Sequence, residues 1–265
     1  MRTLMKKTRI WIAVLAGIMV LTAAASVFAA GAKNGWSGNY YYVNGAKVTG
    51  FKKIGGKGYV FDSKGKLVKD RYAYRLKVKK NSYKYYNITK KGVATQWKST
   101  AAKAAEVLSS LDKNKNTITT KKREKFLKKG FHWAANEIRY LNNEKSGMSA
   151  SKAAKYYGNA AFDDQKGDCD TQAYAIYWMA KVLGYQPKYM RGYIKATSGL
   201  RPYAWCQIKI GKTNYVFDAT LNSAKNGNGE RYTKVYKDEY LGYKKKYGQK
   251  PGYTYYDKDQ KELTD

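Results

Sequence analysis

Residues 167–173 constrain the fold more than any other stretch of this chain. They read Gly-Asp-Cys-Asp-Thr-Gln-Ala and lead directly into an apolar run that continues to Leu183. Gly184 follows this run as a stop signal for a helix. The pattern predicts a buried helix that begins at or near Cys169 and places one face of side chains at helical spacing: Ala173, Ile176, Tyr177, Ala180 and Leu183.

The position of Cys169 makes its thiol a candidate nucleophile. Unpaired backbone N–H groups and the helix dipole at a helix N-terminus favour a thiolate over a thiol. Asp168 and Asp170 act in the opposite direction, since a neighbouring negative charge raises the pKa of a thiol. A cysteine nucleophile also needs a base and a group that orients the base.

The spacing of side chains changes from helical to alternating after Pro187. Three antiparallel strands are expected near residues 189–194, 204–210 and 215–218, with a turn at Gly211-Lys212. Helices are expected earlier, over residues 101–111, 121–141 and 149–157, the last of them capped by Ser149. Helices followed by strands indicate an α+β domain.

The order of these elements resembles the transglutaminase-like core, a relative of the papain-type cysteine proteases. The resemblance covers about residues 121–220 and depends on five short motifs: Gly167-x-Cys169, Leu183-Gly184-Tyr185-Gln186-Pro187, Arg191-Gly192-Tyr193, Ala204-Trp205 and Phe217-Asp218-Ala219-Thr220. It implies helices packed on an antiparallel sheet, with Cys169 as nucleophile, a His base on the next-but-one strand, and Asp218 as the residue that orients the base.

One residue departs from the pattern of that family. Its His immediately precedes the Ala-Trp pair, and here Tyr203 occupies that position. A phenol has an ordinary pKa of about 10, so it removes a thiol proton poorly at neutral pH. The chain has one histidine, His132, on the earlier helix pattern. To replace the missing base it would have to reach Cys169 from a different element. We therefore interpret His132 as a packed or half-exposed helix residue. The site formed by Cys169, Tyr203 and Asp218 is therefore either weakly catalytic or degenerate.

The second cysteine, Cys206, is expected on the opposite side of its strand from Tyr203 and Trp205, because strand side chains alternate. We interpret it as a small core residue. This placement argues against a disulfide with Cys169.

Residues 1–29 have the pattern of a secretory signal peptide. Four positive charges and an apolar run from residue 10 to residue 21 precede small residues, and Val27-Phe28-Ala29 fits a cleavage signal. The alternative is an uncleaved N-terminal anchor. The signal peptide predicts a secreted protein at the cell surface or cell wall.

Residues 30–98 are expected to form a short array of aromatic β-hairpins. Turn signals such as Asn44-Gly45 recur at spacings of about 20 residues. Residues 50–67 resemble one cell-wall-binding repeat of the choline-binding and glucan-binding kind, with weaker copies from Gly35 and near Tyr83. Aromatics either bind a wall polymer or only hold the hairpins together, and the candidates are Trp36, Tyr42, Phe51, Tyr59 and Phe61.

Two positions depart from that repeat pattern, because Phe51 and Gly58 lie where those repeats usually have Trp. A cage of aromatic rings around a cation is therefore not expected. Stacking on glycans or charge attraction from the lysines fits the sequence better.

The formal net charge of +33 attracts polyanions. Residues 1–30 carry four of these positive charges and no acid, which leaves +29 for the rest. Export and the lack of base-reading motifs argue against nucleic acid, so anionic or glycan wall polymers are the expected partners. The alternative reading of the charge is solubility alone. We expect no cofactor and no metal site.

The sequence thus divides into a signal peptide (1–29), hairpin repeats (30–98), a short helix and linker (99–120) and a transglutaminase-like domain with a basic tail (121–265). The tail has a tyrosine stripe at helical spacing: Tyr232, Tyr236, Tyr240, Tyr243 and Tyr247. The expected function is an exported surface protein whose repeats tether this domain. The domain either retains Cys-dependent acyl transfer or amide hydrolysis on a peptide or protein substrate, or binds peptide or wall polymer without catalysis. A third reading is a basic adhesin in which no cleft matters.

Overall fold

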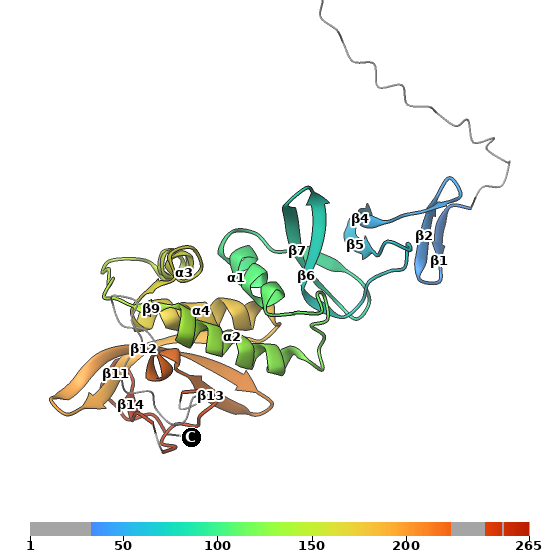
Figure 1. Ribbon diagram of the computed structural model, residues 1–265. Helices are drawn as coiled ribbons and strands as arrows, with labels where there is room; N and C mark the ends of the chain where they lie inside the picture. Colours follow the sequence, from blue (N-terminus) through green and yellow to red (C-terminus); the bar gives the residue numbers. More distant parts are fainter. Residues whose placement is uncertain (1–32, 224–241, 251, 265) are drawn as a thin grey trace, which may run out of the picture.

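The computed structural model describes residues 33–223, 242–250 and 252–264 (Figure 1). The signal-peptide prediction and the tail positions Tyr232, Tyr236 and Tyr240 lie outside these ranges. Within them, every helix is too short or too polar to cross a membrane.

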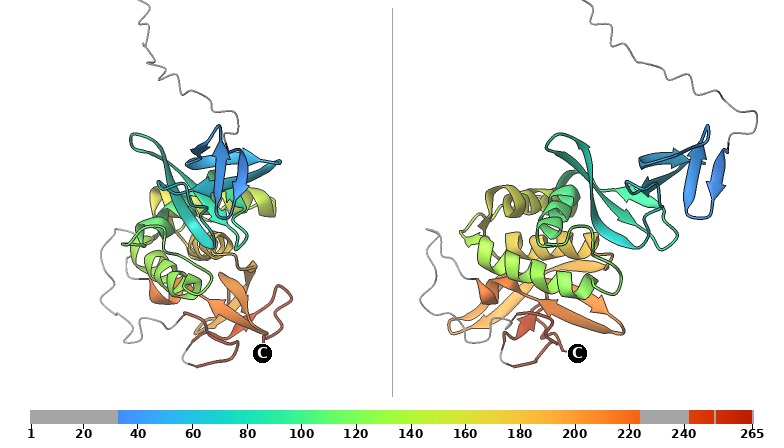
Figure 2. Two further views of the ribbon diagram at one scale, coloured as in Figure 1. Left: turned by 90° about the vertical axis from the view of Figure 1, so that its right-hand side faces the viewer. Right: turned by 45° about the vertical axis from the view of Figure 1, so that its right-hand side comes forward.

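Two small antiparallel sheets form the N-terminal end and project away from the rest of the molecule (Figures 1 and 2). The first contains β1 (Gly35–Ser37), β2 (Tyr40–Val43) and β3 (Ala46–Lys47), and the second contains β4 (Gly50–Ile54) and β5 (Lys57–Phe61). Asn44 and Gly45 connect β2 to β3 with φ of 49° and 79°, the left-handed conformation that the Asn-Gly pair favours in tight hairpin turns.

A third antiparallel sheet joins the hairpins to the helices. It contains β6 (Arg71–Lys79), β7 (Ser82–Ile88) and β8 (Ala94–Gln96). Ala73 and Tyr85 from this sheet are buried in the same apolar cluster as the helices, and Asn87 Nδ2 donates to the backbone oxygen of Val182 at 2.7 Å. This sheet therefore contributes to the main core.

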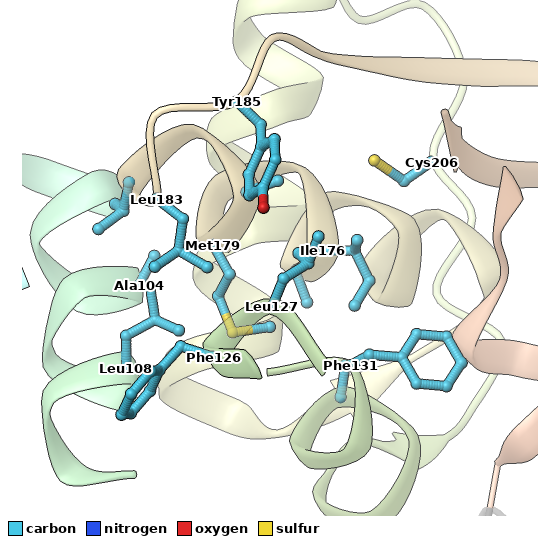
Figure 3. Close-up of a cluster of buried hydrophobic side chains, with 14 of the residues drawn as sticks. Ala104, Leu108, Phe126, Leu127, Phe131, Ile176, Met179, Leu183, Tyr185 and Cys206 are labelled. Carbon is cyan, nitrogen blue, oxygen red and sulfur yellow. The ribbon is translucent and has the colours of Figure 1, made fainter. Parts of the chain in front are cut away.

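Helix α4 (Cys169–Val182) lies at the centre of the helical layer, with α1 (Ser99–Ser110), α2 (Arg123–Glu137) and α3 (Ala150–Asn159) around it. A π-helical turn, η1 (Ala160–Asp164), follows α3. Apolar side chains from α1, α2 and α4 interdigitate in the core that Figure 3 shows, among them Leu108, Leu127, Ile176 and Met179.

The helices cover one face of a four-stranded antiparallel sheet in the order β13-β12-β11-β14 (Figures 1 and 2). Its strands are β11 (Pro187–Ala196), β12 (Gly199–Ile210), β13 (Thr213–Phe217) and β14 (Tyr255–Tyr256). A 3-10 turn, η2 (Ala219–Asn222), follows β13. The α+β fold, with N-terminal hairpins and helices packed on an antiparallel sheet, is the one expected from the sequence.

Three details differ from the sequence-based expectation. The second helix ends at Glu137, because Arg139–Tyr140 forms β9 and pairs in parallel with β10 (Lys166–Gly167). The described part of the tail forms no helix over residues 242–248 and then supplies β14. The segment expected as a linker contains buried Ile118, and α1 belongs to the same core as α2 and α4.

Candidate functional site

The start of α4 is fixed by contacts that place Cys169 at the first helical position. Asp168 is the N-cap, and its carboxylate accepts from the backbone N–H of Thr171 at 3.2 Å. Its own N–H donates to Asn143 Oδ1 at 3.2 Å. Gly167 has φ of 151°, and a Cβ there would lie 2.1 Å from Thr171 Oγ1, so only glycine allows this entry into the helix.

Cys169 lines a cavity of about 300 Å³ together with Tyr203, at the place where α4 faces β12. Burial is the largest of several effects that together raise the pKa of the Cys169 thiol to about 12; the charges of Asp170 and Asp168 act in the same direction, and a hydrogen bond with the backbone of Ala204 lowers it. The main cause, burial, was not one of the two opposing effects expected from the sequence, whereas the charges of Asp168 and Asp170 act in the expected direction.

Tyr203 contacts Asp218, a buried residue that is not among those that line the cavity. Tyr203 Oη donates to Asp218 Oδ1 at 3.0 Å, and Tyr255 Oη donates to Asp218 Oδ2 at 2.8 Å. The backbone N–H groups of Thr220 and Leu221 also donate to Oδ1, at 3.1 and 3.3 Å. The structure thus brings Cys169, Tyr203 and Asp218 to one site, as the resemblance implies.

The electrostatics of this buried group disfavour a base. Burial raises the pKa of Asp218 to about 6, although the hydrogen bonds from Tyr255 and Tyr203 lower it. Burial and the nearby Asp218 carboxylate hold the pKa values of Tyr203 and Tyr255 well above the ordinary value for a phenol. Tyr203 therefore remains protonated and serves as a hydrogen-bond donor.

Trp205 and Cys206 lie on opposite faces of β12. Trp205 packs in the cluster that contains Tyr203 and Tyr255, and its indole Nε1 donates to Tyr247 Oη at 3.1 Å. Cys206 is fully buried in the main core, directed toward α4 (Figure 3). Both cysteines are free in the structure.

The mouth of the cavity carries charges of both signs. The buried carboxylate of Asp170 accepts a hydrogen bond from Tyr189 Oη and lies 3.8 Å from Arg191 Nη1, and Arg191 also pairs with Glu144. Arg201 lines the same cavity from β12. The sequence singled out Arg191 only as part of a motif, and nothing in the pattern pointed to Glu144 or Arg201.

His132 lies on α2, next to Phe131, with ring centroids 6.3 Å apart. It is not among the residues that line the cavity, so the interpretation of His132 as a helix residue outside the site is supported. Among the described residues, no group of three His, Cys, Asp or Glu side chains is arranged to hold a metal ion.

The aromatic candidates of the hairpins fall into two groups. Trp36 is 44% exposed and packs edge-on against Tyr59, with ring centroids 5.0 Å apart, while Phe61 beneath it is only 1% exposed. The amine of Lys33 lies 4.7 Å from the ring centroid of Tyr42. Phe61 therefore packs the hairpins together, whereas a polymer-binding role for Trp36 and Tyr42 stays a prediction.

The departures from the repeat pattern at Phe51 and Gly58 have a common physical reason. The ring of Phe51 stacks on Tyr86 with centroids 5.4 Å apart. A Cβ at position 58 would lie 2.8 Å from both Phe51 Cε2 and the backbone oxygen of Ala94. The Phe51 ring thus fills the space that a side chain at position 58 would need. Phe51 is 46% exposed, and its polymer-binding role also stays a prediction.

No family model matches the chain, and no curated protein matches it. Nine chains of solved structures match. One is a proposed cysteine protease from Cytophaga hutchinsonii, with 19% identity over 51% of this chain and 42% of that chain and a TM-score of 0.32. Another is the periplasmic domain of TgpA from Pseudomonas aeruginosa, with 14% identity over 44% of this chain and 42% of that chain and a TM-score of 0.32. A third is a TGase, with 17% identity over 53% of this chain and 35% of that chain and a TM-score of 0.30.

This chain thus spans less than half the length of each of these three chains. Its own geometry agrees with the transglutaminase-like core: a Cys-bearing helix lies in front of an antiparallel sheet that carries Tyr203, and Asp218 directly follows a strand of that sheet.

Proposed function

We propose that this protein is a transglutaminase-like binding protein that holds a ligand in the Cys169 cavity without turning it over. The hydrogen bond between Tyr203 and Asp218 carries this proposal, because it occupies the carboxylate that would orient an imidazole. A thiol with a pKa of about 12 is also almost wholly protonated at neutral pH. Neither the base nor the thiolate of a cysteine nucleophile is in place.

The chemistry of the cavity fits a peptide or a peptide-bearing wall fragment. Its volume of about 300 Å³ suits a few residues. Arg191 and Arg201 supply positive charge, and Asp168 and Glu144 supply negative charge at the same opening. A peptide has ammonium and carboxylate groups that can pair with the negative and the positive side chains, respectively.

We further propose that the protein is exported and associates with the cell wall through residues 33–98. The sequence pattern of residues 1–29 and the excess of cations in the hairpins support this part of the proposal.

A second candidate function, weak acyl transfer or amide hydrolysis, is favoured by one observation. Cys169 lines the cavity at a helix N-terminus, so a ligand carbonyl could reach its sulfur. The two functions differ in what happens to the bound ligand.

Calorimetry and mass spectrometry with soluble peptidoglycan fragments separate them. We expect saturable binding that Cys169→Ser leaves unchanged and that Arg201→Ala weakens at least tenfold. Lys209→Ala, an exposed cation on the same strand but outside the cavity, is the matched control. Fragment cleavage or cross-linking that disappears in Cys169→Ser would establish the catalytic alternative instead.

A further inference from the structure

The hairpin region carries an excess of positive charge that its own carboxylates do not offset. Residues 33–98 contain seventeen Lys and Arg but two acids, Asp62 and Asp70, a net charge of +15. Asp62 Oδ1 accepts the backbone N–H groups of Lys64 and Lys66 at 2.9 and 2.8 Å, and Asp70 accepts from Thr120. Among the described residues, no ion pair involves a cation of this region.

Three of these cations line one cavity. It has a volume of about 480 Å³ and lies between the first hairpins, the segment that leads into β6, and the loop that contains Asn116. Lys66, Lys69 and Arg71 contribute to its wall together with Tyr74. Asp62 is the one carboxylate among the lining residues, so the cavity has a net positive charge.

Hydrogen bonds hold two of these cations, Lys69 and Arg71, in place. Lys69 Nζ donates to Asn39 Oδ1 at 2.7 Å, and Arg71 Nη1 donates to the backbone oxygens of Lys69 and Asp70, each at 3.0 Å. The second terminal nitrogen of Arg71 has no hydrogen bond to a described residue. The side-chain amide of Asn116 accepts from the backbone N–H of Arg75 and donates to its backbone oxygen. Asn116 therefore forms part of the cavity wall and offers no group to a ligand.

We infer that this cavity binds a phosphate group of an anionic wall polymer whose units are joined by phosphodiesters. An arginine with open donors beside two lysines matches the geometry and charge of a phosphate. The ring of Tyr74 supplies a surface for the polyol or sugar that flanks the phosphate. This inference rests on the proposed wall association and names the chemistry that would produce it.

An oligomer of glycerol phosphate tests the inference, measured by calorimetry on the full mature chain. We expect the double variant Lys66→Gln/Lys69→Gln to bind it at least tenfold more weakly than the parent protein. The matched control is Lys52→Gln/Lys53→Gln, which removes the same charge from exposed positions of β4 outside the cavity and should change the affinity less than twofold. Arg71→Lys, which keeps the charge but loses the planar fork, should weaken binding by an intermediate factor.

Equal losses in the two double variants would overturn the inference, because they would show attraction to net charge alone. Tighter binding of single-stranded DNA than of the oligomer at equal charge would also overturn it, in favour of a general polyanion surface. Sedimentation of the protein with purified cell walls is measured in parallel, to test the wall association separately from the cavity. If the protein sediments but the cavity variants bind the oligomer normally, wall association stands and the cavity is not its site. If the protein does not sediment at all, the wall association itself is wrong.

Discussion

The hydroxyl of Tyr203 donates to the carboxylate of Asp218 across 3.0 Å, in the interior of the protein. The same carboxylate accepts from the phenol of Tyr255 and from two backbone N–H groups. Such a network satisfies a buried charge that would otherwise destabilise the fold. Asp218 therefore has a structural role, and the Tyr203 hydroxyl takes up one of its two carboxylate oxygens.

Replacement of Tyr203 by His should introduce a base between Cys169 and Asp218. The imidazole could accept the thiol proton, and the resulting imidazolium would be stabilised by the carboxylate. A positioned general base typically contributes about 10²–10⁴-fold in rate, and we expect a gain of that order in the hydrolysis of a fluorogenic peptide amide. The double variant Tyr203→His/Cys169→Ala is the control and should be inactive. A folded Tyr203→His variant with no gain would show that the sulfur and position 203 do not share a reacting geometry.

Alkylation by iodoacetamide should report the raised pKa of Cys169. The thiolate is the reactive form, so the rate should increase about tenfold per pH unit from pH 7 to pH 10 without a plateau. Mass spectrometry of the native protein distinguishes this site from Cys206, which is fully buried and should react only after unfolding. A plateau near pH 8 would mean that Cys169 is an activated nucleophile, contrary to the structure.

Local patterns were enough to predict the framework of the site. The apolar spacing after residue 173 and the stop at Gly184 indicated α4, and strand alternation correctly assigned Tyr203 and Cys206 to opposite faces of β12. The order of the short motifs also predicted that Cys169 and Asp218 lie at one site. Each of these inferences depends on a period or a spacing within a short stretch of chain.

What the sequence could not predict depends on contacts between distant residues. Tyr255, 37 residues from Asp218 in the sequence, bonds to it from a two-residue strand. Such a strand is too short to show an alternating pattern in the sequence. The pKa of Cys169 depends mainly on burial in the folded protein, which no local pattern contains. The tyrosine stripe of the tail suggested a helix, but Tyr247 instead bonds to Gln207 on the sheet at 2.7 Å. Tertiary packing overrides local spacing there.

Tyr255→Phe should destabilise the protein by about 1.5–3 kcal/mol, the range for a lost hydrogen bond to a charged group. The substitution removes the 2.8 Å bond to Asp218 Oδ2 but keeps the ring in its cluster. Urea unfolding measures the change. Tyr256→Phe on the same strand is the matched control, because its hydroxyl has no hydrogen bond to a described residue, and it should shift stability by less than about 0.5 kcal/mol. Equal effects would mean that the Tyr255 hydroxyl does not support Asp218.

Truncation should show that the core begins before residue 99. A chain of residues 71–265 keeps β6–β8 and α1, and we expect it to unfold cooperatively, as the full chain does. A chain of residues 121–265 lacks Leu108 and Tyr85 and leaves apolar faces of α2 and α4 uncovered. It should bind a hydrophobic dye and lack a cooperative transition. The point variant Leu108→Ala in the full chain should lower stability by about 2–5 kcal/mol. Native-like unfolding of residues 121–265 would place the boundary at the linker instead.

Asp168→Asn should change how stability depends on pH near the site. Burial and repulsion from Asp170 raise the pKa of Asp168 to about 6 in the folded protein, above the ordinary value of about 3.9. Between these values the folded state binds more protons than the unfolded state, so this group makes the protein less stable as pH rises from about 4 to about 6. The variant lacks this effect and keeps the cap, since asparagine is an equally good N-cap. Its stability relative to the parent should therefore increase over that window and then level off.

Asp168→Ala separates the charge from the cap in the same experiment. It removes the acceptor for the Thr171 N–H and should lower stability by about 0.5–2 kcal/mol relative to Asp168→Asn at every pH, with the same dependence on pH. Both variants also remove a negative charge beside Cys169, so its alkylation rate at pH 9 should increase in both. Stability differences that do not vary between pH 4 and pH 6 would mean that Asp168 is hydrated in solution, because desolvation is the main cause of its raised pKa.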